Sequence, residues 1–109
     1  PLVGLDVAKE MTFTGRRISG QEALAVGLAT RVCDDPVGAA LETAKLIASR
    51  SPEAIRAGKQ LFNRAPQLPV REAFELETEL QLPLLRSPNQ LEAVRANMMK
   101  QTPLFKDPA

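Results

Sequence analysis

Four glutamates fall within eight residues of this chain, and closely spaced carboxylates are the side chains best able to do chemistry here. Glu72, Glu75, Glu77 and Glu79 could in principle hold a metal ion or share acid–base work. At about 100° per residue, Glu72, Glu75 and Glu79 lie on the polar face of the expected helix, which indicates a solvated surface instead. Glu77 falls on the apolar face, where an ion pair or a hydrogen bond at an interface is the more ordinary role.

Three cations and one cysteine are the remaining candidates. Arg16 and Arg17 lie beside Gly15, where they either bind a phosphate or serve a structural or solvated role. Lys100 falls in the last turn of an expected helix, a position that favours a cation because of the helix dipole. Cys33 lies in an apolar stretch, so we expect a buried small hydrophobic residue there and not a nucleophile.

Composition excludes several classes of function. The 109 residues contain no histidine, which removes Ser-His and Cys-His dyads and the usual imidazole base. A net charge of +1 argues against a nucleic-acid partner, and no apolar run approaches the length of a membrane span. A single cysteine allows no intrachain disulfide and no cysteine metal cluster. With no signal peptide in sight, we expect a cytoplasmic chain with no metal site; its first residue, proline, suggests a processed or partial polypeptide.

Residues 12–33 predict a compact series of short elements. Gly15 suits a turn with positive φ, and Ser19 with Glu22 has the spacing of a capping box that starts a short helix. Gly27 suits the left-handed residue that ends such a helix. Short strands are expected near residues 16–18 and 29–33, since Val32 is β-branched and its neighbours are mostly apolar.

Apolar periodicity predicts helices over most of the remaining chain. Three of them begin with a capping residue followed by proline, at Pro36, Pro52 and Pro88. Gly58 is expected where two helices approach closely, and Pro83 is expected to end or kink its helix. The expected helices cover about residues 3–11, 20–26, 36–50, 52–65, 70–82 and 88–102.

Several blocks of this sequence resemble the crotonase (enoyl-CoA hydratase/isomerase) superfamily. The run TFTGRRISGQEALAVGLATRV is similar to the segment that follows the catalytic core in that family, and later blocks follow in the family's order. The matching residues are Thr14, Gly15, Ile18, Ser19, Glu22, Ala23, Gly27, Leu28, Val32, Ala48, Ser51, Pro52, Ala54, Lys59, Glu77, Gln81, Ser87, Glu92, Lys100, Pro103 and Phe105.

The resemblance implies a mainly α chain that forms the helical C-terminal segment of a crotonase fold. Residues 1–34 would be the tail end of the core, and residues 35–109 the C-terminal helical oligomerisation domain of a homo-oligomer, a trimer or hexamer in the complete protein. That protein would hydrate an enoyl-CoA or shift its double bond in fatty-acid metabolism. The family's oxyanion hole and catalytic glutamates lie upstream, so we expect no catalytic residue here and no activity from the chain alone.

The resemblance also suggests a contact with the substrate. In family members the last helix reaches the coenzyme A of an adjacent subunit through a phenylalanine and a lysine; Lys100 stands at the lysine position and Asn97 at the phenylalanine position. Acyl-CoA would be the substrate, with no tightly bound cofactor. Two other hypotheses stay open: a stand-alone helical self-association module without catalysis, and a chain that binds acyl-CoA without chemistry.

Overall fold

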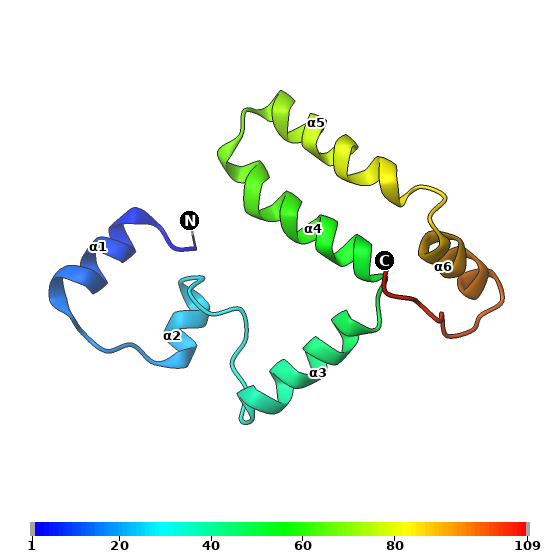
Figure 1. The fold of residues 1–109 in the computed structure, drawn as a ribbon. Helices are drawn as coiled ribbons and strands as arrows, with labels where there is room; N and C mark the ends of the chain where they lie inside the picture. The colour runs from blue at the N-terminus through cyan, green and yellow to red at the C-terminus, as the bar shows by residue number, and fades with distance from the viewer. Residues whose placement is uncertain (1, 109) are drawn as a thin grey trace. The chain divides into compact units, whose positions relative to one another are not determined.

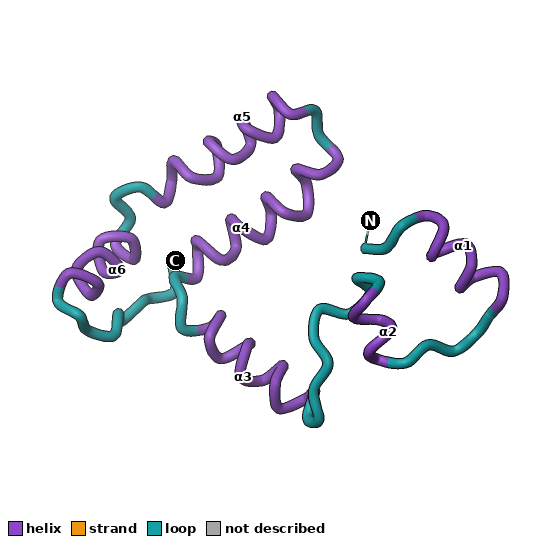
Figure 2. Tube along the Cα trace, turned by 180° about the vertical axis from the view of Figure 1, so that it is seen from behind, coloured by secondary structure: helices purple, strands orange, loops and turns teal. Residues whose placement is uncertain are grey.

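Six α-helices make up most of residues 2–108, the part of the chain that the computed structural model describes (Figures 1 and 2). The elements are α1 (Leu5–Thr14), α2 (Gly20–Ala25), α3 (Pro36–Ala48), α4 (Pro52–Arg64), α5 (Val70–Gln81) and α6 (Pro88–Met98), with short 3₁₀ turns η1 (Ala65–Gln67) and η2 (Leu82–Leu84). All six expected helices are therefore present. The first begins later than expected because Gly4 is its extended N-cap and not part of its apolar face.

The chain divides into two compact units, one ending at Leu41 and the other beginning at Glu42. The division into a core tail over residues 1–34 and an oligomerisation domain over residues 35–109 stays a prediction.

Turn chemistry explains the elements of the first unit. Gly15, with φ of 61°, ends α1 in the left-handed conformation that its position suggested. The Ser19 hydroxyl accepts a hydrogen bond from the Glu22 amide at 3.1 Å and so caps α2, which Gly27 closes with φ of 84°. The second half of the predicted capping box is different, because the Glu22 carboxylate binds the Arg16 guanidinium at 2.7 Å.

The predicted strands near residues 16–18 and 29–33 are wrong, since no strand occurs in the part of the chain that the structure describes. A strand exists only when a neighbouring strand pairs with its backbone, and the described chain offers these residues no such neighbour. Both stretches are irregular connections. The Val32 side chain is 39% exposed, and Cys33 is only half-buried, not fully buried as expected.

In the second unit, α4 and α5 lie side by side and antiparallel, joined by η1 (Figures 1 and 2). Pro83 lies in η2, directly after α5, and ends that helix as predicted. The Ser87 hydroxyl accepts from the Gln90 amide at 3.2 Å and caps α6. Ser51 does not cap α4 with its side chain, contrary to prediction, and only its carbonyl accepts the first helical hydrogen bond.

Very little of the described chain is buried. Leu76 on α5 is 4% exposed and Ala96 on α6 is 1% exposed, and they are the only buried apolar residues among those described. Large apolar side chains on every helix are exposed instead, including Phe62 at 79% and Phe74 at 65%. The helices thus keep their amphipathic faces without a core inside the described chain to receive them.

Candidate functional site

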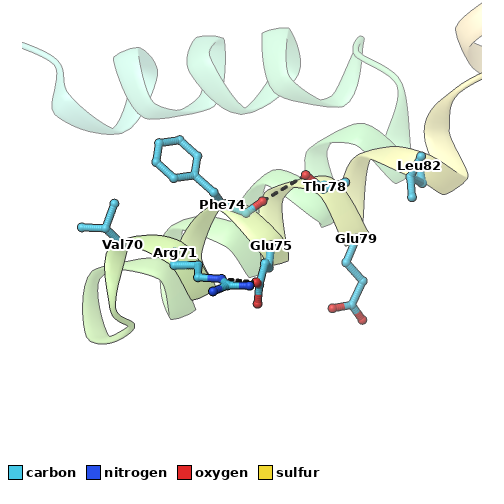
Figure 3. A pocket seen from close by; sticks show the side chains of 7 residues that line it. All are labelled: Val70, Arg71, Phe74, Glu75, Thr78, Glu79 and Leu82. Atoms are coloured by element: carbon cyan, nitrogen blue, oxygen red, sulfur yellow. Dashed lines mark hydrogen bonds and ion pairs between the residues drawn. The ribbon is translucent and has the colours of Figure 1, made fainter.

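The cluster of glutamates on α5 does not form a metal site. Arg71 binds Glu75 at 2.9 Å, as Figure 3 shows, and Glu79 stands apart from them on the same helix. Among residues 2–108, no group of three potential ligand side chains is placed to hold a metal ion. Val70, Phe74 and Leu82 line the same open hollow of about 900 Å³ as these charged residues. Because α5 and Leu82 directly after it supply the whole lining, this hollow is an exposed helix face and not an enclosed pocket.

Glu77 occupies a different setting, in the groove between α4 and α5. It lines two adjacent hollows of about 410 and 240 Å³, one beside Phe62 and Phe74 and the other beside Gly58 and Ala54. A side chain added at Gly58 would meet nothing within 4 Å, so the close helix approach predicted there is wrong for α4 and α5. The groove therefore presents an apolar floor, open space above Gly58 and one carboxylate.

Two of the three guanidinium nitrogens of Arg16 bind carboxylates. Its Nε donates to Glu10 Oε1 at 2.7 Å, and its Nη2 donates to Glu10 Oε2 at 2.9 Å and to Glu22 Oε1 at 2.7 Å. The hydrogen bonds from Arg16 lower the pKa of both carboxyl groups. This arrangement ties α1 to α2 and supports the structural role over the phosphate-binding role.

Lys100 and Asn97 come together at the end of α6. Lys100 lies beyond the helix and not in its last turn as predicted, because the chain turns left-handed there with φ of 52°. Its amide donates to the Asn97 carbonyl at 3.3 Å, and the next amide, of Gln101, donates to the Ala96 carbonyl at 2.8 Å. Both side chains are exposed, and the neighbouring Met98 is 78% exposed. The turn presents an ammonium group beside apolar surface, a combination that suits a ligand with both phosphate and apolar parts.

A ring of hydrogen bonds, not expected from the sequence, surrounds this turn. Arg95 Nη2 and Nε donate to Glu92 Oε1 and Oε2 at 2.6 and 2.8 Å, and Arg95 Nη1 donates to Gln101 Oε1 at 3.0 Å. Glu92 Oε1 also accepts from the Leu104 amide at 3.0 Å. The hydrogen bonds from Arg95 and from that amide lower the pKa of Glu92 to about 2. The spacing of Glu92 and Arg95 along the helix predicts their pairing, but nothing local indicates the contacts with the C-terminal tail, residues 101–108.

Asn89 binds the C-terminal tail at Lys106. It is 5% exposed, and its amide Nδ2 donates to Glu53 Oε2 at 2.8 Å and to the Lys106 carbonyl at 2.7 Å. Its Oδ1 accepts from the Lys106 amide at 3.0 Å. One side chain therefore joins the start of α4, the start of α6 and the tail, which Figure 1 shows returning to α4. No periodicity relates Asn89 to Lys106 or to Glu53, so the sequence could not reveal this contact.

The described helices are too short or too polar to cross a membrane: none has an 18-residue apolar window.

Comparison with known proteins identifies relatives along almost the whole chain. The family model for enoyl-CoA hydratase/isomerase matches residues 2–108. The chain is 32% identical over 102 residues to a short-chain-enoyl-CoA hydratase of Clostridium acetobutylicum, covering 92% of this chain and 39% of that protein. It is 33% identical over 106 residues to a carnitinyl-CoA dehydratase of Proteus mirabilis, covering 92% of this chain and 41% of the relative.

Solved structures of enoyl-CoA hydratases have the same fold as this chain over the matched residues. The crystal structure of an enoyl-CoA hydratase from Bacillus anthracis matches with a TM-score of 0.88 and 35% identity, covering 96% of this chain and 42% of that one. The chain thus spans about two-fifths of the length of the relatives it matches. Since the family model covers residues 2–108, the chain belongs to the enoyl-CoA hydratase/isomerase family.

Proposed function

We propose that the chain is the C-terminal segment of a family member that acts on acyl-CoA thioesters, hydrating an enoyl-CoA or shifting its double bond in fatty-acid metabolism. In this proposal the segment supplies an oligomerisation surface and part of the CoA pocket, and the complete protein is a trimer or hexamer. Support comes from its membership of the family and from its match to about two-fifths of each relative. The cytoplasmic location expected from the sequence stays a prediction.

The observation that carries the proposal is the exposure of apolar side chains along α4 and α5. Phe62, Val70 and Phe74 are 79%, 74% and 65% exposed and line adjoining hollows there. Apolar surface of this kind marks an interface in a folded protein. Burying one such side chain stabilises a folded protein by roughly 1.5–3 kcal/mol. In this proposal, a second copy of the chain or the rest of the complete protein covers these side chains.

Oligomeric state and turnover test this proposal. Light scattering coupled to size exclusion is expected to give a defined oligomer, and Phe74→Ser is expected to shift it toward the monomer. Phe13→Ser removes a phenylalanine that is 80% exposed from α1, outside the proposed surface, and should leave the oligomer unchanged. A monomer at every concentration contradicts the oligomerisation role. Turnover of crotonyl-CoA by the chain alone contradicts the proposal that its catalytic residues lie elsewhere.

The contact with coenzyme A is proposed for Lys100, with Asn97 beside it. The Lys100 ammonium group makes no hydrogen bond or ion pair with residues 2–108, and the side chains of Lys100 and Asn97 are both exposed at the end of α6. Calorimetric titration with CoA is expected to show binding that Lys100→Ala weakens about tenfold, the effect of one charge-assisted hydrogen bond. Unchanged affinity in that variant contradicts the contact.

A stand-alone self-association module without catalysis is the second candidate. The same exposed faces favour it, because self-association alone would cover them. A defined oligomer that neither binds CoA nor turns over crotonyl-CoA would favour this candidate over the first.

A further inference from the structure

Lys100 occupies a backbone conformation that a lysine adopts only at a cost. The two hydrogen bonds that end α6, from the amides of Lys100 and Gln101, form the helix ending that normally has glycine at the left-handed position. The same pair of bonds ends α2, and there Gly27 fills that position. Because a Cβ atom disfavours positive φ, contacts outside the turn must hold Lys100 in place.

The ring of hydrogen bonds described above supplies those contacts on both sides of Lys100. Arg95 lies before the turn and holds the Gln101 side chain directly after it. Glu92 holds Arg95 with two hydrogen bonds and also holds the Leu104 amide further along the tail. The chain is thus fixed before and after the strained residue.

The cation of the ring is Arg95, and the Lys100 ammonium group makes no hydrogen bond or ion pair with residues 2–108. All three donor nitrogens of Arg95 are engaged by Glu92 and Gln101. A lysine on a rigid turn loses less freedom on binding than one on a mobile tail, and preorganisation of this kind raises affinity.

We propose that Glu92 and Arg95 are positioning residues that hold the left-handed turn at Lys100, and thereby direct its ammonium group to a phosphate of coenzyme A. This inference rests on the proposed CoA contact of Lys100 and adds the two residues that act through it.

Calorimetric titration with CoA on matched variants tests the inference. Glu92→Gln is expected to weaken binding about fivefold or more, because it removes the charge that pairs with Arg95 and the oxygen that accepts from Arg95 Nε. Glu79→Gln makes the same change of charge on α5, away from the turn, and should leave affinity unaltered. The double variant Glu92→Gln with Lys100→Ala should bind no more weakly than Lys100→Ala alone, since both act on one contact.

Backbone dynamics give a reading that does not depend on CoA. Amide exchange at Gln101 is expected to accelerate in Glu92→Gln and in Arg95→Met but not in Glu79→Gln. Lys100→Gly should keep the turn and its protection while binding CoA as weakly as Lys100→Ala, since glycine suits the conformation but has no ammonium group.

The outcomes separate failure of the inference from failure of the contact. If Lys100→Ala weakens binding and Glu92→Gln does not, or if the two effects add, the positioning role is overturned while the CoA contact stands. Unchanged exchange at Gln101 in Glu92→Gln also overturns the positioning role. If Lys100→Ala binds CoA as well as the unaltered chain, or the unaltered chain shows no binding at millimolar CoA, the contact itself is overturned and the inference with it.

Discussion

Replacing Asn89 with aspartate should release the C-terminal tail from the start of α4 and α6. The substitution keeps the size of the side chain and the oxygen that accepts from the Lys106 amide at 3.0 Å. It removes the two donated hydrogen bonds, to Glu53 at 2.8 Å and to the Lys106 carbonyl at 2.7 Å. It also places a second carboxylate against Glu53 in a site that is only 5% exposed.

The magnitude follows from those two hydrogen bonds. A bond to a charged partner contributes about 1.5–3 kcal/mol and a neutral one about 0.5–1.5 kcal/mol, so the free energy that holds the tail should fall by about 2–4.5 kcal/mol at pH 7. Amide exchange at Lys106, followed by nuclear magnetic resonance, should accelerate about 30-fold or more if the tail opens locally. The effect should shrink in acid, because a protonated carboxyl group can donate a hydrogen bond again.

A matched substitution on the surface provides the control. Asn63 lies in the last turn of α4, is exposed and makes no side-chain hydrogen bond among the described residues, so Asn63→Asp should change stability by about 0.5 kcal/mol or less. If Asn89→Asp leaves Lys106 exchange and the urea midpoint where Asn63→Asp leaves them, the reasoning from the buried amide is refuted.

Two further predictions concern acid and glycine. The pKa of Glu92 is lowered to about 2, so its carboxylate should stabilise the tail fully above about pH 4.5 and lose that effect as the pH falls toward 2. Amide hydrogen exchange at Leu104 should show this pH dependence, and Glu92→Gln should abolish it. Gly58→Ala should raise the free energy of unfolding by up to about 1 kcal/mol, since Gly58 is helical and has open space around it. Gly15→Ala should lower the free energy of unfolding by about 1 kcal/mol, because φ at Gly15 is 61°. Urea denaturation measures both, and equal effects of the two alanines would contradict the assignment of their conformations.

Local signals made the helices and their ends predictable. Gly15, Ser19 and Gly27 act through bonds to residues a few positions away, so their types and spacing fix the turn and the short helix together. Pro83 ends α5 for the same reason, since a missing amide acts on its own turn.

Two of the features that the sequence did not predict depend on distant partners, and a third on an unusual residue in a local turn. The stretch near Val32 has the residue types of a strand, but pairing needs a second strand that the described chain does not provide. Asn89 and Lys106 are 17 positions apart and no pattern relates them, so the most buried polar contact could not be read from the sequence. The sequence pattern predicts Lys100 within the helix, because the left-handed turn has a lysine at the position where a glycine usually marks the end of a helix.

The contrast between regular helices and a nearly absent core bears on how this chain is stabilised. The longest helices have 13 residues, a length at which a helix in water is marginal without tertiary packing. Packing within the described residues buries only Leu76 and Ala96 among apolar side chains, while Phe62 and Phe74 stay exposed along α4 and α5. Polar contacts such as those of Asn89 can fix the geometry of α4, α6 and the C-terminal tail, but each contributes only about 0.5–3 kcal/mol net. If copies of the chain cover these apolar faces, as proposed above, the stability of the isolated chain should rise with its concentration.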